Sequence, residues 1–356
     1  MENIRQDLER TLALALEEGA SDLHLSVGRY PTLRIDGVLV PLSKEEMVTP
    51  ERSEQFANAL LTIDQQQRFL QEKDIDFSYD FKGKARFRVN IFRQRGFIGS
   101  ALRLIPSRIR TIEELKLPKI LRGFTKRMQG FLLVVGPAGH GKSTTLAALI
   151  NELNHSRDNN VITIEDPIEY IFVQDRCIIS QRELYHDTIS FSRGLRAALR
   201  EDPDVIMVGE MRDLDTTATA LTAAETGHLV FTTLHTNNAA QTIDRIIDSF
   251  PAGQQGQVRS QLAATILGIV SERLVPRVGG GRVPAVEIMI ANSAVRNLIR
   301  EKKTHEIDLV IETSADIGMI KLNRSLANLV KQGEITLENA EIYSTNQEEL
   351  RMLLQK

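Results

Sequence analysis

The sequence predicts an α/β protein with two domains, a small α+β domain followed by a larger domain built on a parallel sheet. The chain has 356 residues, which is enough for two separate hydrophobic cores. In the first 105 residues, short strand patterns separated by turn signals predict antiparallel strands. From about residue 120, apolar β-branched runs alternate with helical patterns, which is typical of a parallel sheet covered on both faces.

The first predicted domain covers residues 1–105 and combines two helical stretches with six short strands. Apolar residues recur at helical spacing from Ile4 to Ala15, and Gly19 ends that helix. A second helical stretch covers 50–72 and is broken near Ile63. The strands are expected at 23–25, 32–35, 38–40, 76–80, 85–92 and 98–104, with turn signals at Asp36-Gly37, Lys82-Gly83 and Arg95-Gly96.

Residues 106–119 form the predicted linker, and residues 120–356 form the second domain. Three consecutive glycines at 279–281 predict a loop tip between two short strand-like segments. Beyond Val286 the chain reads as mostly helical, for example over 293–303 and 322–331. The buried-type strands of the second domain are expected at 131–135, 161–164, 205–208 and 229–232.

The composition is that of a globular protein and gives no general attraction to nucleic acid. The net charge is −3 and the chain contains no Trp, which argues against a nucleic-acid partner. Cys177 is the single cysteine, so neither an intrachain disulfide nor a cysteine-based zinc site can form. The first residues lack the apolar core of a signal peptide, and there is no run of 18 apolar residues. We therefore expect a cytoplasmic protein that contacts a membrane only through a partner.

The segment from Gly136 to Ser143 reads Gly-Pro-Ala-Gly-His-Gly-Lys-Ser and fits the phosphate-binding loop G-x-x-x-x-G-K-[ST]. It follows the apolar strand at 131–135 and precedes a helical stretch over 144–154, which is the context that this loop requires. Glycines allow backbone N–H groups to surround phosphate oxygens, and a helix N-terminus attracts anions. The motif predicts that the protein binds a nucleoside triphosphate, for which we expect ATP.

This loop supplies the expected nucleotide and metal ligands. Lys142 can reach the β- and γ-phosphates, and the Ser143 hydroxyl can ligate Mg²⁺. The expected nucleotide-binding residues are Gly136, Pro137, Ala138, Gly139, His140, Gly141, Lys142, Ser143 and Thr144.

Two apolar strands end in carboxylates that suit phosphate chemistry. The strand at 205–208 leads to Glu210, and the strand at 161–164 leads to Glu165. At the carboxyl end of a parallel sheet, Glu210 would lie on the Mg²⁺ side, acting through water. Glu165 could orient or deprotonate an attacking water molecule. Alternatively, the carboxylates at Glu165 and Asp166 only cap the turn that Asp166-Pro167 signals.

Two histidines, His228 and His235, flank the strand predicted at 229–232. Their separation of seven residues differs from the spacing of four in a helical zinc pair. Each could be a structural histidine with a satisfied ring. The alternative is that one of them senses the γ-phosphate or couples it to another group by a hydrogen bond.

A dense run of arginines lies on and after the predicted strand at 85–92. Strand alternation places Arg86 and Arg88 on one face, and Arg93 and Arg95 follow toward the turn. Two interpretations remain open for this run. It is either a solvated sheet face or a set of arginine fingers that reach the γ-phosphate of a neighbouring subunit.

Taken together, these motifs resemble the secretion-type hexameric ATPases, most closely the branch that retracts type IV pili in twitching motility. Residues 294–301 read Ala-Val-Arg-Asn-Leu-Ile-Arg-Glu, similar to the A-I-R-N-L-I-R-E element of that branch. The pilus-extension and type II secretion relatives usually carry a four-cysteine zinc loop, which a single cysteine cannot build. The matching stretches are the phosphate loop, an acidic box at 163–169, a Walker B segment at 204–212, a His box at 227–236 and residues 294–301.

The resemblance implies a PAS-like N-terminal domain and a RecA-like P-loop NTPase domain, assembled as a homohexamer. Glu165 would be the catalytic glutamate, Glu210 the Walker B glutamate, and Arg86 and Arg88 nucleotide-contacting arginines. Two positions depart from the family pattern, because His140 replaces a small polar residue and Thr233 stands where glycine is expected. The implied catalytic set is Glu165, Glu210, Arg86, Arg88, His228 and His235, with ATP and Mg²⁺ as cofactors.

The function that the resemblance implies is an ATP-hydrolysing motor that powers pilus retraction. Its partner would be an inner-membrane platform protein, so the ring would be cytoplasmic and peripherally associated with that membrane. A pilus-extension or type II secretion ATPase is the nearest alternative. A non-hydrolysing accessory paralogue of the ring and a RecA-like nucleic-acid translocase also remain open.

Overall fold

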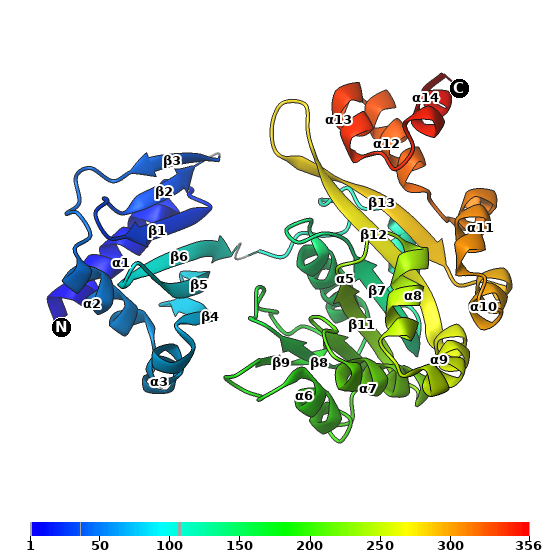
Figure 1. Cartoon of the computed structure of the whole chain (residues 1–356), viewed down its shortest axis with the longest axis horizontal. Coiled ribbons are helices and arrows are strands. Elements are labelled where there is room, and N and C mark those ends of the chain that lie inside the picture. Colours follow the sequence, from blue (N-terminus) through cyan, green and yellow to red (C-terminus); the bar gives the residue numbers. More distant parts are fainter. Residues whose placement is uncertain (1, 36, 106–107, 356) are drawn as a thin grey trace. The chain divides into compact units, whose positions relative to one another are not determined.

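The computed structural model describes residues 2–35, 37–105 and 108–355 (Figure 1). These residues divide into two compact units, each with a sheet of its own. The first unit contains the chain up to Arg108 together with Asp166–Ile171, and the second contains Ile109–Glu165 and the chain from Phe172 onward. Asp36 of the expected hairpin signal and residues 106–107 of the expected linker lie outside the described residues.

The first unit is an antiparallel sheet of six strands in the order β3-β2-β1-β6-β5-β4, packed with three helices. Each of the six predicted strands is present. The strands are β1 (Asp22–Ser26), β2 (Thr32–Ile35), β3 (Val38–Pro41), β4 (Asp74–Phe81), β5 (Ala85–Gln94) and β6 (Phe97–Ile105). The helices are α1 (Glu2–Glu17), α2 (Pro50–Leu60) and α3 (Ile63–Glu72).

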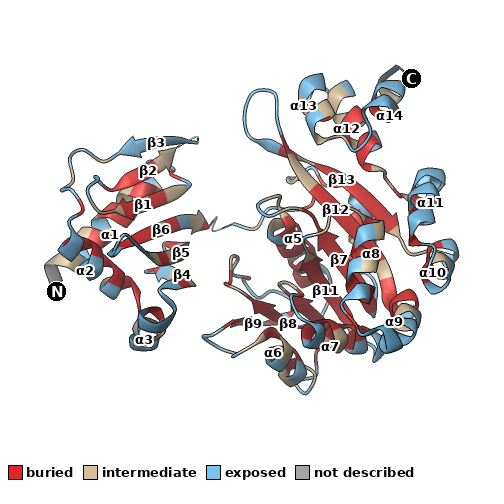
Figure 2. Cartoon of the chain, viewed as in Figure 1, coloured by how far each residue is buried: buried red, intermediate tan, exposed pale blue. Residues whose placement is uncertain are grey.

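Local sequence explains two features of this unit. The predicted break between α2 and α3 occurs at Thr62, whose side chain accepts a hydrogen bond from Gln65 N while the Gln65 side chain accepts one from Thr62 N. Along β5, buried residues alternate with half-exposed ones (Figure 2). Phe87 therefore faces the core and Arg88 does not.

The second unit is a seven-stranded sheet in the order β13-β12-β7-β11-β10-β8-β9. All neighbouring pairs are parallel except β12 and β13, which form an antiparallel hairpin. Every residue of β7 is buried, which shows that both faces of the sheet are covered. The strands are β7 (Gly130–Val135), β8 (Asn160–Glu165), β9 (Ile178–Glu183), β10 (Val205–Val208), β11 (Leu229–Leu234), β12 (Ile266–Pro276) and β13 (Arg282–Ile290).

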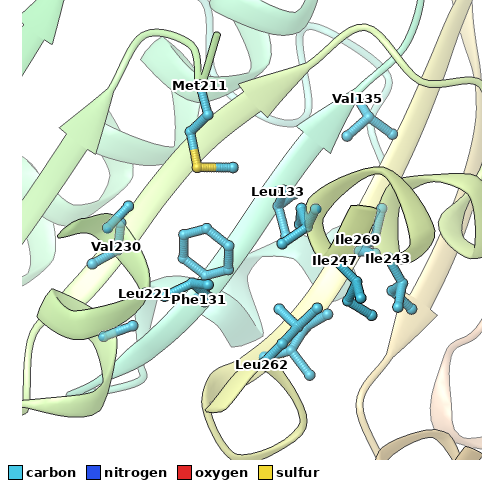
Figure 3. Close-up of a cluster of buried hydrophobic side chains, with 14 of the residues drawn as sticks. Phe131, Leu133, Val135, Met211, Leu221, Val230, Ile243, Ile247, Leu262 and Ile269 are labelled. Carbon is cyan, nitrogen blue, oxygen red and sulfur yellow. The ribbon is translucent and has the colours of Figure 1, made fainter. Parts of the chain in front are cut away.

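The main hydrophobic core lies between this sheet and the helices α6 to α9 (Figures 1 and 3). Phe131 and Leu133 of β7 contribute to it, and so does Met211, the residue that follows Glu210. The helices of the unit are α4 (Arg122–Thr125), α5 (Lys142–Ser156), α6 (Phe191–Ala198), α7 (Leu214–Glu225), α8 (Ala239–Asp248), α9 (Ala252–Thr265), α10 (Ser293–Arg300), α11 (Ile307–Thr313), α12 (Leu322–Lys331), α13 (Leu337–Tyr343) and α14 (Gln347–Gln355).

The structure extends the predicted sheet by one edge strand and a long hairpin. β9 escapes sequence patterning because four of its six residues are polar, and only two of the six are buried, as suits an edge. In β12, Ser271, Glu272 and Arg273 interrupt the apolar run, so an 11-residue strand reads as shorter segments. The chain beyond Val286 is mostly helical, as predicted, but β13 continues to Ile290 before the helices begin. Within the described residues, no helix combines the length and apolar character needed to cross a membrane.

Candidate active site

The loop that joins β7 to α5 depends on glycine at particular positions. Its φ angles are 145° at Gly136, 75° at Gly139 and 98° at Gly141, a region that other residues rarely adopt. A Cβ at Gly141 would also lie 2.6 Å from Oε1 of Glu272, and one at Gly136 would overlap the backbone oxygen of Glu272. The loop therefore needs glycine both for its backbone conformation and for the space that Glu272 occupies.

Lys142 begins α5, and its side chain turns back beneath the loop. Its Nζ donates hydrogen bonds to the carbonyl oxygens of Gly136 at 2.8 Å and Pro137 at 2.9 Å. The residue is 8% exposed, so the ammonium group is close to its partners and shielded from water. This is the position from which the lysine of a phosphate-binding loop reaches the β- and γ-phosphates.

His235 connects this lysine to the end of a neighbouring strand. Its Nδ1 lies 3.3 Å from Lys142 Nζ and, since an ammonium group only donates, Nδ1 acts as the acceptor. Nε2 then carries the proton and faces Oε2 of Glu210 at 3.5 Å. The other carboxylate oxygen of Glu210 lies 2.5 Å from Nη2 of Arg212. A continuous row of contacts thus runs from the phosphate-binding loop to the residues that follow β10.

The turn that carries Glu210 is fixed from both sides. Gly209 donates its backbone N–H to the carbonyl oxygen of Ile164 at 2.8 Å, and the Thr233 hydroxyl donates to the carbonyl oxygen of Gly209 at 2.6 Å. Met211, the residue after Glu210, packs its buried side chain into the main hydrophobic core. Thr233, a departure from the family pattern, therefore has a definite structural contact in this chain.

Glu165 ends β8 and is buried, with 8% of its surface exposed. Its Oε1 accepts hydrogen bonds from Thr163 Oγ1 at 2.6 Å and from Gln181 Nε2 at 3.1 Å. Because β8 and β10 are adjacent and parallel, Glu165 and Glu210 emerge at the same edge of the sheet. Whether Glu165 is catalytic or only structural therefore remains a prediction.

The β12–β13 hairpin also contacts the phosphate-binding loop. The backbone N–H of Leu274 donates to Nδ1 of His140 at 2.9 Å, and Arg282 Nη1 donates to the carbonyl oxygen of Gly139 at 3.2 Å. Sequence reasoning noted His140 only as a departure from the family pattern and placed a loop tip at 279–281, but it did not single out Glu272 or the contacts of the hairpin with the loop. A carboxylate in a mainly apolar segment was the available signal.

Burial dominates the electrostatics beneath the loop. It lowers the pKa of His140, and the positive charges of Arg282, Arg273 and Lys142 lower it further, in keeping with a neutral ring that accepts from Leu274. Burial raises the pKa of Glu272 to about 7, although the Thr145 hydroxyl and the Lys142 charge both act in the opposite direction.

His228 lies at the amino end of β11, the end away from His235. Its Nδ1 lies 2.9 Å from the carbonyl oxygen of Ala223 and 3.3 Å from the Thr226 hydroxyl, both at the C-terminal end of α7. Of the two predicted histidines, the structure therefore brings His235, and not His228, to Lys142 and Glu210. A catalytic role for His228 remains a prediction.

The four arginines of the basic run belong to the first unit. Arg86 donates to the Ser78 hydroxyl at 2.5 Å, and Arg88 pairs with Asp76 at 2.5 Å between Nη2 and Oδ2. The side-chain contacts of Arg86 and Arg88 lie on the half-exposed face of the first sheet. The β5–β6 turn region carries the other two, Arg93 and Arg95. Whether they reach a nucleotide remains a prediction.

Ser143 and Glu210 are the residues that could hold a magnesium ion. Ser143 is exposed in the first turn of α5, and its hydroxyl and the Glu210 carboxylate are the oxygen ligands that Mg²⁺ prefers. The described residues contain no group of three or more His, Cys, Asp or Glu side chains suited to a metal. This donor set fits an ion held by a few protein oxygens with phosphates and water, rather than by an all-protein cage.

Comparisons with known proteins support the resemblance that the sequence motifs indicated. Residues 1–342 match the family model described as type II/IV secretion system protein. The chain is 46% identical over 337 residues to the type IV pilus retraction ATPase PilT of Pseudomonas aeruginosa, covering 94% of this chain and 97% of that protein. It is 45% identical over 321 residues to a twitching motility protein of Neisseria gonorrhoeae, covering 90% and 86% of the two chains.

A solved structure supports the same relationship. The crystal structure of the pilus retraction motor PilT with bound ADP superposes with a TM-score of 0.89 at 47% sequence identity. The match covers 97% of this chain and 98% of that one. The fold is therefore a PAS-like α+β domain followed by a RecA-like P-loop NTPase domain, and the chain binds nucleotide.

Proposed function

Since this chain belongs to the type II/IV secretion system protein family, we propose that it is the ATP-hydrolysing motor that retracts type IV pili. The chain is an ATPase of this family, and two relatives that are 45% and 46% identical over 90% and 94% of this chain are named for twitching motility and pilus retraction. The observation that carries the proposal within the chain is the row from Lys142 through His235 to Glu210. It joins the phosphate-binding loop to the acidic end of a second parallel strand.

The proposed chemistry follows from these positions. Lys142 would bind the β- and γ-phosphates, while Glu165 would take the proton of the attacking water. The Thr163 and Gln181 contacts hold the Glu165 carboxylate in one orientation, which general base catalysis requires. His235 would link the charge of Lys142 to that of Glu210 and so report the occupancy of the loop.

Magnesium is part of the proposal. Ser143 and Glu210 would hold the ion, Glu210 through water, and the ion would neutralise charge on the phosphate oxygens. In that role Glu210 would depend on Arg212 and His235, which orient its two oxygens.

The proposed assembly is a ring of six copies. Arg86 and Arg88 would then approach the nucleotide of a neighbouring subunit and stabilise charge on the γ-phosphoryl group. Residues 106–119 would act as the linker across which hydrolysis shifts one domain against the other. The ring would pass this motion to an inner-membrane platform protein and would be associated with the membrane only through it.

Piliation of a deletion strain tests the function. Loss of the gene should leave excess surface pili and abolish twitching, and restoring the wild-type gene should reverse both effects. Restoring the Lys142→Ala variant should not, because binding of the triphosphate depends on that ammonium group. Cells without pili after the deletion would instead identify an extension motor.

A further inference from the structure

A buried carboxyl group, that of Glu272, lies directly behind the phosphate-binding loop and has no part in the chemistry described above. Glu272 belongs to β12, which pairs in parallel with β7, the strand that leads into the loop. Its surface is 3% exposed. Carboxylates are rarely buried to this degree without a paired charge, because the ionised form loses its hydration.

The side chain of Glu272 faces the loop and the first turn of α5. Oε2 accepts a hydrogen bond from the Thr145 hydroxyl at 2.6 Å. Oε1 lies against Gly141, because a Cβ added to that residue would be only 2.6 Å from it. The backbone of Gly141 belongs to the cradle whose N–H groups surround phosphate in this motif. The carboxyl group therefore supports the cradle from the side opposite the phosphates.

The charges around Glu272 come mainly from one lysine. Lys142 of α5 lowers the pKa of Glu272, but burial outweighs it and leaves that pKa at about 7. β7 has no charged residue, and β13 places Val286 opposite Glu272.

The other polar and charged groups near the loop make contacts that do not include Glu272. Ser271 and Arg273, on either side of Glu272 in the strand, make their contacts with Glu287 and with the backbone of α13. Alternation along a strand therefore puts them on the opposite face from Glu272. His140 accepts from Leu274, and Arg282 donates to Gly139 on the loop itself.

We propose that Glu272 is a positioning residue of the nucleotide site, and that its protonation state sets the affinity of the loop for the anionic nucleotide. The proposal rests on the proposed function, since it assumes that the loop binds a nucleoside di- or triphosphate. When the carboxyl group is neutral, it supports Gly141 and Thr145 without adding charge. When it is ionised, its negative charge repels the phosphates and weakens their attraction to Lys142.

The direction of the effect follows from linkage. The charge of a bound nucleotide raises the pKa of Glu272 above its value in the free protein, so binding takes up a proton. Below the pKa of the free protein the affinity is independent of this group. As pH rises from there, the affinity falls by up to about tenfold per pH unit, until it passes the pKa in the complex. Burial lowers the pKa of His140, and His140 is present in both proteins compared below, so it does not contribute to their difference.

Calorimetric titration with ADP tests this, between about pH 6.5 and pH 8.5, in two buffers of different ionisation enthalpy. In the Glu272→Gln variant the Thr145 contact and the shape of the side chain remain, but the titrating group is gone. We expect the wild-type affinity to fall by about tenfold more than that of Glu272→Gln over this range, with more proton uptake in the wild type than in the variant. Protonation of ADP itself is common to both proteins and cancels in this difference.

Two further variants keep the inference falsifiable. Glu287→Gln removes an equally buried carboxyl group that binds Ala239 N, away from the loop, and should keep the wild-type profile. Thr145→Val removes the hydrogen bond that lowers the pKa of Glu272, so the fall in affinity should move to higher pH. Parallel profiles in the wild type and Glu272→Gln would overturn the role of Glu272. Absence of ADP binding at every pH would instead overturn the proposed function.

Discussion

His235 lies between Lys142 and Glu210, with Nδ1 3.3 Å from the ammonium group and Nε2 3.5 Å from the carboxylate. Lys142 begins α5 and Glu210 follows β10, so one ring joins two groups of opposite charge from different elements. Any change at the phosphate-binding loop that moves Lys142 changes the hydrogen bonding of Glu210. This contact gives the His box a physical connection to the nucleotide site within one chain.

Replacing this ring tests the connection. His235→Ala should lower kcat by about tenfold or more, because a hydrogen bond between charged and neutral groups contributes about 1.5–3 kcal/mol. Steady-state ATPase assays measure it. His155→Ala is the matched control, since His155 pairs with Asp175 on the exposed surface and should leave kcat unchanged. Equal rates for the two variants would show that His235 is not coupled to hydrolysis.

Glu165 should be required for hydrolysis but not for binding. In Glu165→Gln the amide cannot accept a proton from water, so kcat should fall by about 10²–10⁴-fold while ATP still binds. Phosphate release and nucleotide affinity are measured separately. Glu183→Gln, at the register partner of Glu165 on β9, is the control for loss of a buried carboxylate at this edge. Near-normal phosphate release from Glu165→Gln would refute the assigned role.

Two glycines of the loop should differ in their tolerance of a methyl group. Gly141→Ala combines an unfavourable φ of 98° with a Cβ 2.6 Å from Glu272, whereas Gly139→Ala has only the unfavourable φ of 75° and open space. Both variants carry backbone strain, but only Gly141→Ala adds the overlap with Glu272, and overpacking of this kind costs about 1–3 kcal/mol. Nucleotide affinity should therefore fall by about tenfold more in Gly141→Ala. Similar affinities in the two variants would mean that Glu272 does not restrict the loop.

Thr233 should stabilise the turn that carries Glu210. Thr233→Val keeps the β-branched shape but leaves the Gly209 carbonyl oxygen without its 2.6 Å donor. The free energy of unfolding should fall by about 0.5–1.5 kcal/mol, with lower ATPase activity, because one part-buried hydrogen bond is lost. Urea unfolding measures the first and phosphate release the second. A Thr233→Val protein as stable and as active as the wild type would contradict this.

The two buried carboxyl groups make stability depend on pH. Burial raises the pKa of Glu272 and of Glu287 from 4.5 to about 7 in each case. Between these values the folded chain binds more protons at these two groups than the unfolded chain does, so the stability that they contribute is fully present below about pH 4.5 and is lost as pH rises through about 7. Each group should contribute about 3 kcal/mol to this loss. Urea unfolding from about pH 5 to pH 8 should show it, and Glu272→Gln with Glu287→Gln should flatten the dependence. An unchanged slope in that double variant would contradict it.

Sequence patterns predicted the six strands of the first sheet, the break before α3 and four parallel strands of the second sheet. These features depend on periodicity and turn residues within short windows, which are visible without the fold. The phosphate-binding loop was also visible, because its glycines and lysine serve a local backbone conformation. The edge strand β9 and the full length of β12 and β13 were missed, since polar residues interrupt their apolar pattern.

By itself, then, the sequence determined which segments form strands and helices and that one loop binds phosphate, because these properties arise between residues near one another in the chain. The tertiary structure decided that Glu272 supports Gly141 from behind and that His235 joins Lys142 to Glu210. Those contacts depend on the order in which β12, β7, β11 and β10 lie side by side. Strand order is set by packing of the whole sheet, and no local pattern encodes it.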